Sequence, residues 1–276
     1  MFSVAILMTI YNRRERVLAS LEEIIRQSEA LASGGEYSFD IYVHDDGSTD
    51  GAGDAVEKAF PSVILLRGDG NRFWSRGLRA AWMEAAKKGY DFYMWTDYDS
   101  VLREDAMWNL LDTSSFLANK AIVCGTVANP DGVLMYGGRS RSGKIIEPDG
   151  YVPVPCYLFD GHLVLVPKYV FRKVGLLDER FHQGLGDYDY AYRSGKARID
   201  RVVAAGILAD CSRKVTLPSY RDASLTLRER YEALSKPKGK PLKENFLFDV
   251  KSKGLFKAIW NFLKTNFQVL FPKHNG

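Results

Sequence analysis

The sequence predicts an α/β fold with a mostly parallel central sheet, helices on both faces of the sheet, and a helical extension at the C-terminal end. Two observations support this class. Through the first hundred residues short apolar runs alternate with segments of helical periodicity, and a polar cluster follows nearly every apolar run. Such alternation builds a parallel sheet covered on both faces, and ligands bind beyond the carboxyl ends of its strands.

Four apolar runs are predicted as strands, and the segments between them as helices. The strands are expected at residues 2–10, 39–43, 63–66 and 92–96. The helices are expected around residues 17–25, 52–60 and 74–88, with stop signals at Pro61 and Gly89. Shorter β-like runs follow at residues 121–127, 157–160 and 162–166, and we expect them to frame a second side of the ligand site.

Composition limits the class of protein. The chain has 276 residues, 46% of them hydrophobic and 26% charged, which is typical of a globular domain with an appendage. Cys124, Cys156 and Cys211 form no CxxC pair, so neither a zinc site nor a disulfide framework is predicted. The N-terminal apolar run is too short to span a membrane and has no basic region before it, so no signal peptide is predicted. We therefore expect a cytoplasmic protein.

The net charge of +4 is unevenly distributed along the chain. Residues 228–276 carry 11 Lys and Arg against 4 Asp and Glu, a net charge of +7, which leaves −3 for residues 1–227. A protein that binds nucleic acid usually spreads basic residues over its folded body, so we expect no nucleic-acid partner. A basic, aromatic tail favours an anionic membrane surface, on the inner face of the cell membrane.

Two acidic motifs follow predicted strands. Residues 45–50, DDGSTD, offer carboxylates and hydroxyls to a ligand, and Gly47 lets the backbone turn sharply. The alternative is a turn whose Asp and Ser cap the next helix. Asp97 and Asp99 are two residues apart and suit a divalent cation with a bound diphosphate, because hard cations prefer oxygen ligands. The alternative for this pair is an ordinary surface loop.

The order of four motifs favours a ligand site over these alternatives. MTIYNR, DDGSTD, GNRFW and TDYDS start at residues 8, 45, 70 and 96. As an ordered set they resemble the family 2 glycosyltransferases, which have the Rossmann-like GT-A fold, over about residues 3–230. The resemblance implies a nucleotide-sugar donor and a Mn²⁺ or Mg²⁺ ion held by Asp99. The donor-binding residues that it implies are Thr9, Tyr11, Arg13, Asp46, Asn71, Arg76 (or Arg72) and Asp97.

A downstream segment, residues 181–193, resembles the family segment that delivers the general base, and Asp187 falls on the base position. A carboxylate there would take the proton of the acceptor hydroxyl. The alternative is that Asp187 caps the following helix. Two departures from the family pattern follow. Gly186 replaces the usual acid before the base, and the usual histidine metal ligand is absent, so Asp210 is the candidate third ligand, with His162 and His182 as alternatives.

The resemblance implies an inverting transfer from a UDP- or dTDP-linked sugar to a saccharide or a lipid-linked saccharide in cell-surface polysaccharide synthesis. Two rival functions stay open: an inactive GT-A scaffold that binds a partner or membrane, and a sugar nucleotidyltransferase. The second is disfavoured because the first strand leads into TIYNR and not into a Gly-rich phosphate loop. A dehydrogenase is disfavoured because Gly51 and Gly53 lack the third glycine of the dinucleotide-binding motif.

The expected organisation is a GT-A domain at residues 1–235, with a nucleotide-sugar-binding half at 1–100 and an acceptor-binding half at 101–235, followed by a basic amphipathic extension at 236–276. Residues 251–273 are predicted as one interfacial helix. Its apolar face would contain Phe256, Ile259, Trp260, Leu263, Phe267 and Leu270. The alternative is that this helix packs on the catalytic domain or on a second subunit in a homodimer.

Overall fold

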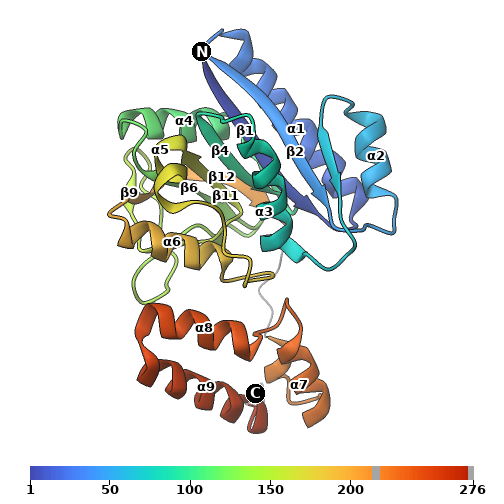
Figure 1. Cartoon of the computed structure of the whole chain (residues 1–276), viewed down its shortest axis with the longest axis vertical. Coiled ribbons are helices and arrows are strands. Elements are labelled where there is room, and N and C mark those ends of the chain that lie inside the picture. The colour runs from blue at the N-terminus through green and yellow to red at the C-terminus, as the bar shows by residue number, and fades with distance from the viewer. Residues whose placement is uncertain (213–217, 273–276) are drawn as a thin grey trace.

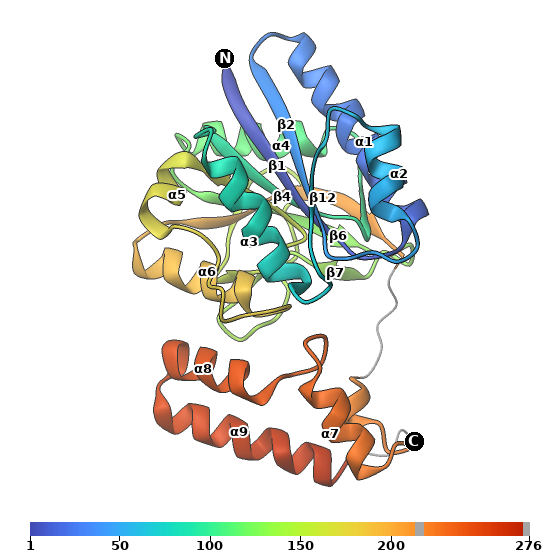
Figure 2. The same cartoon turned by 45° about the vertical axis from the view of Figure 1, so that its right-hand side comes forward.

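The computed structural model describes residues 1–212 and 218–272, and it has two parts. An α/β body contains the sheet, and a smaller helical unit lies below it in Figure 1. Figure 2, turned by 45°, shows the same separation. In both views α8 (Leu242–Lys253) lies on the side of the helical unit that faces the body, and α9 (Leu255–Leu270) lies on the far side.

The main sheet has the strand order β3-β2-β1-β4-β11-β6-β12-β5, with β7 and β9 at its margin. Strands β1, β2, β3 and β4 are parallel, and β6 is parallel to β12, whereas β11 is antiparallel to both of its neighbours. The main strands are β1 (Phe2–Ile10), β2 (Tyr37–Asp45), β3 (Ile64–Arg67), β4 (Phe92–Asp97), β5 (Ser100–Leu102), β6 (Ile122–Ala128), β11 (Leu163–Pro167) and β12 (Arg201–Cys211). The short strands are β7 (Leu134–Tyr136), β8 (Gly138–Arg139), β9 (Val154–Pro155) and β10 (Leu158–Phe159). The predicted mostly parallel sheet is confirmed.

Helices cover both faces of this sheet, as predicted. Alternate residues of β1 face opposite layers: Ile6 packs in the core with α1 and α2, and Leu7 packs in the core with α3. Both side chains are fully buried, because a strand between two helical layers has no solvent face. The helices of the body are α1 (Arg14–Ser33), α2 (Ala52–Ala59), α3 (Phe73–Ala86), α4 (Ala106–Phe116), α5 (Lys168–Val174) and α6 (Gly186–Lys196).

The helical unit contains the 3₁₀ turn η1 (Ser219–Arg221), α7 (Leu227–Ser235), α8 and α9. Tyr220, Leu234 and Val269 form its small core, so η1 and α7 pack with α9. In this packing η1 and α7 lie with α9, whereas the sequence analysis grouped residues up to 235 with the α/β domain, and that division stays a prediction. Linker-like composition at 236–241 gave that boundary, but these residues form a turn inside the unit.

The C-terminal helix also differs from its prediction. Gly254 has φ of 84° and ψ of 165°, a conformation that favours glycine, and it separates α8 from α9. A single helix over 251–273 is therefore interrupted at 254, and its predicted last residue lies outside the described residues. Within residues 1–212 and 218–272, no helix is long and apolar enough to cross a membrane.

Candidate active site

A cavity of about 870 Å³ opens at the carboxyl ends of β1, β2 and β4 and extends to α6 and the helical unit. The parallel register brings the strand ends together: Thr9 of β1 pairs with Asp97 of β4, and Ile10 pairs with Asp45 of β2. The predicted site residues that line the cavity are Thr9, Tyr11, Arg13, Asp46, Asp97, Asp99 and Asp187. Seven positions spread over 179 residues of sequence thus lie around one space.

Asp46 fixes the wall of this cavity. Its buried carboxylate accepts hydrogen bonds from the backbone N–H groups of Arg72 (3.1 Å to each oxygen) and Phe73 (2.7 Å), at the start of α3. A carboxylate at a helix N-terminus satisfies free backbone donors and interacts favourably with the helix dipole. Gly47 beside it has φ of 73°, and a Cβ there would lie 2.8 Å from the backbone nitrogen of Gly70. Asp46 thus anchors α3, while Asp50 of the same motif accepts from the N–H of Ala52, at the start of the next helix α2, at 3.0 Å.

Asp97 and Asp99 form a close acidic pair. The backbone N–H of Asp99 donates to Asp97 Oδ1 at 3.0 Å, and Arg16 Nη1 lies 3.2 Å from Asp99 Oδ1. His162 Nε2 is 3.6 Å from Asp97 Oδ2. Burial and the negative charges of Asp99 and Asp97 raise the pKa of the Tyr98 hydroxyl between them to about 12. The cavity wall therefore presents two carboxylates with Arg13 and Arg16 beside them.

These oxygens fit a hard divalent cation. Mg²⁺ is usually held by one or two carboxylates together with substrate phosphates and water, and does not need an all-protein cage. Among the residues that the structure describes, no group of three or more His, Cys, Asp or Glu side chains is arranged to hold a metal. Asp99 and Asp97 thus offer a carboxylate pair that suits a shared site with a diphosphate.

Asp210 is placed differently from its prediction as a metal ligand. It lies on β12 beside β5, outside the cavity lining, and its carboxylate makes a two-point ion pair with Arg103, at 2.8 Å to Nε and 2.7 Å to Nη2. Two further predicted donor residues also lie outside the lining. Asn71 bonds to Asp69, and Arg76 Nε donates to the carbonyl oxygen of Glu179 at 2.7 Å.

Asp187 lies in the first turn of α6 and is 8% exposed. Its Oδ2 accepts from the N–H of Gly161 at 2.9 Å, and its Oδ1 accepts from the N–H of Tyr188 at 2.8 Å. Burial, followed by the negative charge of Asp160, raises the pKa of the Asp187 carboxyl from 3.8 to about 7. The N-cap position of α6 is Leu185, and Asp187, two residues on, accepts the N–H of Tyr188 in the first turn of the same helix. A carboxyl that titrates near neutrality in a cavity has the protonation chemistry that a general base needs.

Asp160 is a cavity residue that sequence reasoning missed. It receives Arg139 Nε at 2.9 and 3.0 Å, the Tyr188 hydroxyl at 3.0 Å and the N–H of Gly137 at 3.1 Å. A sequence signal existed, because Asp160 is the last residue of the predicted run at 157–160 and follows its apolar residues, just as Asp97 follows the fourth strand.

The helical unit also contributes to the cavity, which the sequence did not reveal. Its lining residues are Pro237, Lys238, Gly239, Lys240, Pro241, Glu244 and Asn245. They come from the turn before α8 and from the first turns of α8. The cavity is therefore enclosed by the body on one side and by the helical unit on the other.

Comparison with known proteins agrees with this geometry. The family model for glycosyl transferase family 2 matches residues 5–181, which is more than half of the chain. The chain belongs to glycosyl transferase family 2. The predicted family and the GT-A fold are thereby confirmed, and glycosyl transfer is the activity class of this family 2 glycosyltransferase. No curated protein matches the sequence.

Solved structures share the fold of this glycosyltransferase at low sequence identity. Residues 1–349 of TarS from S. aureus align at 12% identity with a TM-score of 0.52, covering 96% of this chain and 74% of that one. GalNAc-T7, solved with UDP, GalNAc and Mn²⁺, aligns at 12% identity with a TM-score of 0.55, covering 97% of this chain and 55% of that one. At this identity the likeness establishes the fold.

Proposed function

We propose that this protein is an inverting glycosyltransferase that moves a sugar from a UDP- or dTDP-linked donor to an acceptor hydroxyl. The observation that carries the proposal is that two kinds of carboxyl group line the same cavity. The acidic pair Asp97 and Asp99 lines one part of it, and Asp187, with a pKa near neutrality, lines another. A donor diphosphate with its cation suits the first, and an acceptor hydroxyl suits the second.

The donor end uses the strand termini. Thr9 and Asp97 are register partners on β1 and β4, and Arg13 lies on the same wall. Thr9 and Asp97 thus offer acceptors to ribose hydroxyls, and the Arg13 guanidinium offers a positive charge to the phosphates. Asp99 with Asp97 would hold Mn²⁺ or Mg²⁺, which when bound neutralises the charge that develops on the leaving diphosphate. The UDP and Mn²⁺ of the GalNAc-T7 structure are consistent with this choice of probes.

The acceptor end uses Asp187 as the general base. In one displacement the acceptor O–H gives its proton to Asp187, the acceptor oxygen forms a bond to the anomeric carbon, and the bond from that carbon to the diphosphate oxygen breaks. The electron pair of the broken bond leaves with the nucleoside diphosphate. Attack from the side opposite the leaving group inverts the anomeric centre. The N–H groups of Gly161 and Tyr188 hold both Asp187 oxygens in place before the proton moves.

The exposed face of α9 supports a membrane-borne acceptor, a saccharide on a lipid carrier. The predicted apolar face points to solvent: Phe256 is 91% exposed, Trp260 63% and Phe267 61%, whereas Val269 on the other face is buried. The predicted alternative of packing on the catalytic domain is therefore not what α9 does with this face. Lysines of the same helix, such as Lys257, give charge complementarity to an anionic bilayer. We assign a bilayer and not a second subunit to this face.

A ligand screen tests the glycosyltransferase proposal. Purified protein is heated with UDP- and dTDP-sugars, with and without Mn²⁺, and the preferred donor is then assayed for release of the nucleoside diphosphate. We expect a raised Tm with one donor, because a ligand that binds only the folded state stabilises it by mass action, and diphosphate release that stops in Asp187→Asn. A scaffold would give no release. A nucleotidyltransferase would instead release pyrophosphate from a nucleoside triphosphate and a sugar phosphate.

A sedimentation assay tests the membrane proposal. Trp260→Glu places a charge on the exposed face of α9, and Trp108→Glu, at a 52% exposed position on α4, is the matched control. The parent and the control should sediment with anionic vesicles at low salt and less at high salt, and Trp260→Glu should stay in solution. Equal sedimentation of all three proteins would contradict the proposal, and concentration-dependent dimers lost in Trp260→Glu would assign the face to a second subunit.

A further inference from the structure

Helix α8 contacts the body through one face, and that face meets the segment that bears Asp187. Glu244, Phe248 and Lys251 are spaced four and three residues apart, so they lie on one side of the helix. All three contact residues between 178 and 189. The helical unit thus holds the segment in which the proposed base lies.

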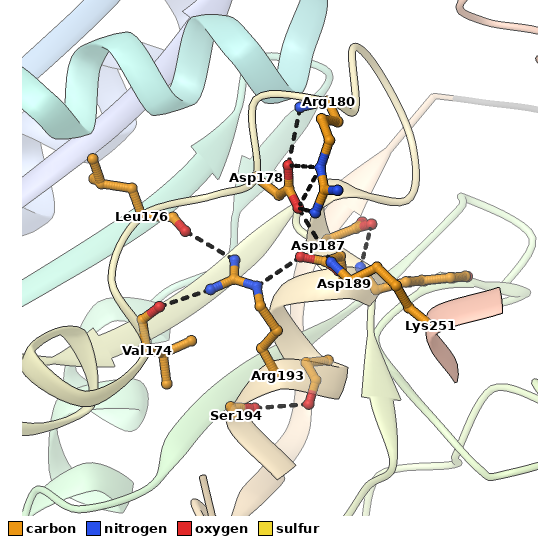
Figure 3. Close-up of polar contacts among 11 residues, drawn as sticks. Val174, Leu176, Asp178, Arg180, Asp187, Asp189, Arg193, Ser194 and Lys251 are labelled. Carbon is orange, nitrogen blue, oxygen red and sulfur yellow. Dashed lines mark hydrogen bonds and ion pairs between the residues drawn. The ribbon is translucent and has the colours of Figure 1, made fainter. Parts of the chain in front are cut away.

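Lys251 joins the two ends of this segment. Its Nζ lies 3.1 Å from Asp178 Oδ2 and donates to Asp189 Oδ1, and Figure 3 shows its side chain reaching both carboxylates. The Asp189 side chain is fully buried, and its second oxygen accepts from Arg193 Nε at 2.7 Å. Removing one partner of a buried carboxylate strongly destabilises a folded protein, so loss of the Lys251 contact to Asp189 is costly. Asp178 also pairs with Arg180, whose Nη2 is 2.6 Å from Oδ2.

Two more contacts fix the middle of the segment. The Glu244 carboxylate accepts from the backbone N–H of His182 at 3.2 Å and contacts His182 Nδ1 at 2.7 Å. The ring of Phe248 is buried, with its centroid 6.4 Å from the ring centroids of both Phe181 and Tyr188. Tyr188 is the residue next to Asp187 and donates its N–H to that carboxylate.

The segment needs such support because its backbone is strained and the loop before α6 has no regular secondary structure. Leu185, two residues before Asp187, has φ of 72°, which is uncommon for a residue with a side chain. A strained turn persists when the surrounding contacts over-determine it. Lys251, Glu244 and Phe248 supply such contacts from outside the α/β body, since their helix belongs to the C-terminal unit.

We propose that α8 is the positioning element of the acceptor side, and that Lys251 is a positioning residue that fixes the Asp187-bearing turn by joining Asp178 to Asp189. This inference rests on the proposed function for its catalytic consequence. Its structural consequence, the ordering of residues 178–189 by α8, is independent of that function. Glu244 and Asn245 line the cavity on the same helix, so displacement of α8 also changes the wall that an acceptor would meet.

The test compares three full-length variants. Lys251→Met removes the cation with little change of length, and Lys251→Arg retains a cation that is able to bridge two carboxylates. Lys253→Met is the matched control, because Lys253 pairs with Asp249 inside α8, at 2.7 Å. Amide hydrogen exchange of residues 178–189 is the first readout. We expect faster exchange in Lys251→Met and parent-like exchange in the other two variants.

The second readout uses the donor that the ligand screen selects. We expect Lys251→Met to lower kcat by about 10-fold or more with donor Kd within two-fold of the parent, because a small displacement of a base costs rate and not donor binding. The acidic limb of the kcat–pH profile of Lys251→Met should also move to lower pH. A loosened turn exposes the Asp187 carboxyl to water, which lowers the pKa of that carboxyl. Lys251→Arg should restore kcat to within about three-fold.

Failure of the two proposals would look different. A parent enzyme that turns over no nucleotide sugar contradicts the proposed function, while hydrogen exchange still reports on α8. Unchanged exchange at 178–189 in Lys251→Met overturns the positioning role, whatever the activity. An equal fall of kcat in Lys251→Met and Lys253→Met also overturns it, because a general loss of stability in α8 would explain both.

Discussion

The raised pKa of Asp187 has a consequence for stability that does not depend on any substrate. In the folded protein this carboxyl titrates near 7, and in the unfolded chain near its ordinary value of 3.8. Between these values the folded state binds more protons than the unfolded state. Stability contributed by Asp187 is therefore greatest at low pH and falls as pH rises from about 4 to 7.

The size of the effect follows from the same two values. Integration of the proton-binding difference for this one group gives a loss of about 2–3 kcal/mol between pH 5 and pH 8. Asp187→Asn removes the titration and so removes this loss. The amide has one strong acceptor oxygen, as does the protonated carboxyl that predominates in the folded parent at pH 5, so at that pH one of the N–H groups of Gly161 and Tyr188 lacks a strong partner in both proteins.

The assay is urea unfolding of the parent and of Asp187→Asn at pH 5, 6, 7 and 8. We expect the two proteins to differ least at pH 5, and the difference to shift in favour of the variant by about 2–3 kcal/mol by pH 8. Asp112→Asn, an exposed position on α4, controls for the loss of one carboxyl elsewhere. Parallel stability profiles for the parent and Asp187→Asn would refute the raised pKa, and with it the proton-accepting role.

Three further predictions concern the cavity. Asp99→Asn should abolish the Mn²⁺-dependent part of donor binding without unfolding the protein, since a neutral amide is a poor ligand for a hard cation, and unchanged Mn²⁺ dependence in calorimetry would count against the assignment. Asp160→Asn should move the acidic limb of the kcat–pH profile to lower pH, because the Asp160 charge raises the pKa of Asp187, and a shift to higher pH would contradict this account. Gly186→Glu, which introduces the acid of the family pattern, should destabilise the fold by about 1–3 kcal/mol in urea unfolding, because a Cβ there would lie 2.0 Å from Ser75 Oγ, and a stabilised variant would show that the turn accommodates the side chain.

The fold was predictable where burial was simple. Strands between two helical layers, such as β1, are continuous apolar runs in the sequence. The structure places β1, β2, β3 and β4 within two residues of their predicted bounds. β12 was missed, since its run contains Ala204, Ala205 and Gly206 and its pairing with β6 is irregular there. Small residues and a shifted register weaken the alternation that identifies a strand.

Helix α8 was missed for a different reason. One of its faces packs on the body through Phe248, and Phe246 packs against Phe262 of α9. A short helix covered from two sides by mixed polar and apolar contacts has no single apolar stripe, so its periodicity gives little signal. The part of the cavity wall that it forms could not be predicted either, because contacts such as that of Lys251 with Asp189 join positions 62 residues apart.

The same limit explains the candidate metal ligands. Spacing along the chain placed Asp210 near the position of the family's third ligand, but spacing carries no information about a neighbouring strand. Arg103, just beyond β5, meets Asp210 across the sheet edge and binds both of its oxygens. By contrast Asp97 and Thr9 could be placed together, since parallel strand ends meet at one edge of the sheet.

The glycine at position 186, where the family pattern has an acid, has a physical explanation in the packing and charge around Asp187, the proposed base. The family pattern has an acid immediately before the base, and here that position has no room for a side chain, because Ser75 of α3 lies against it. Asp160, after β10, provides a second carboxylate beside Asp187 from another part of the chain. Arg139 and the Tyr188 hydroxyl hold the Asp160 carboxylate in place near Asp187, the proposed base. Burial is the main cause of the raised pKa of Asp187, and the charge of Asp160 adds to it, although Asp160 lies 27 positions earlier in the sequence and not directly beside Asp187.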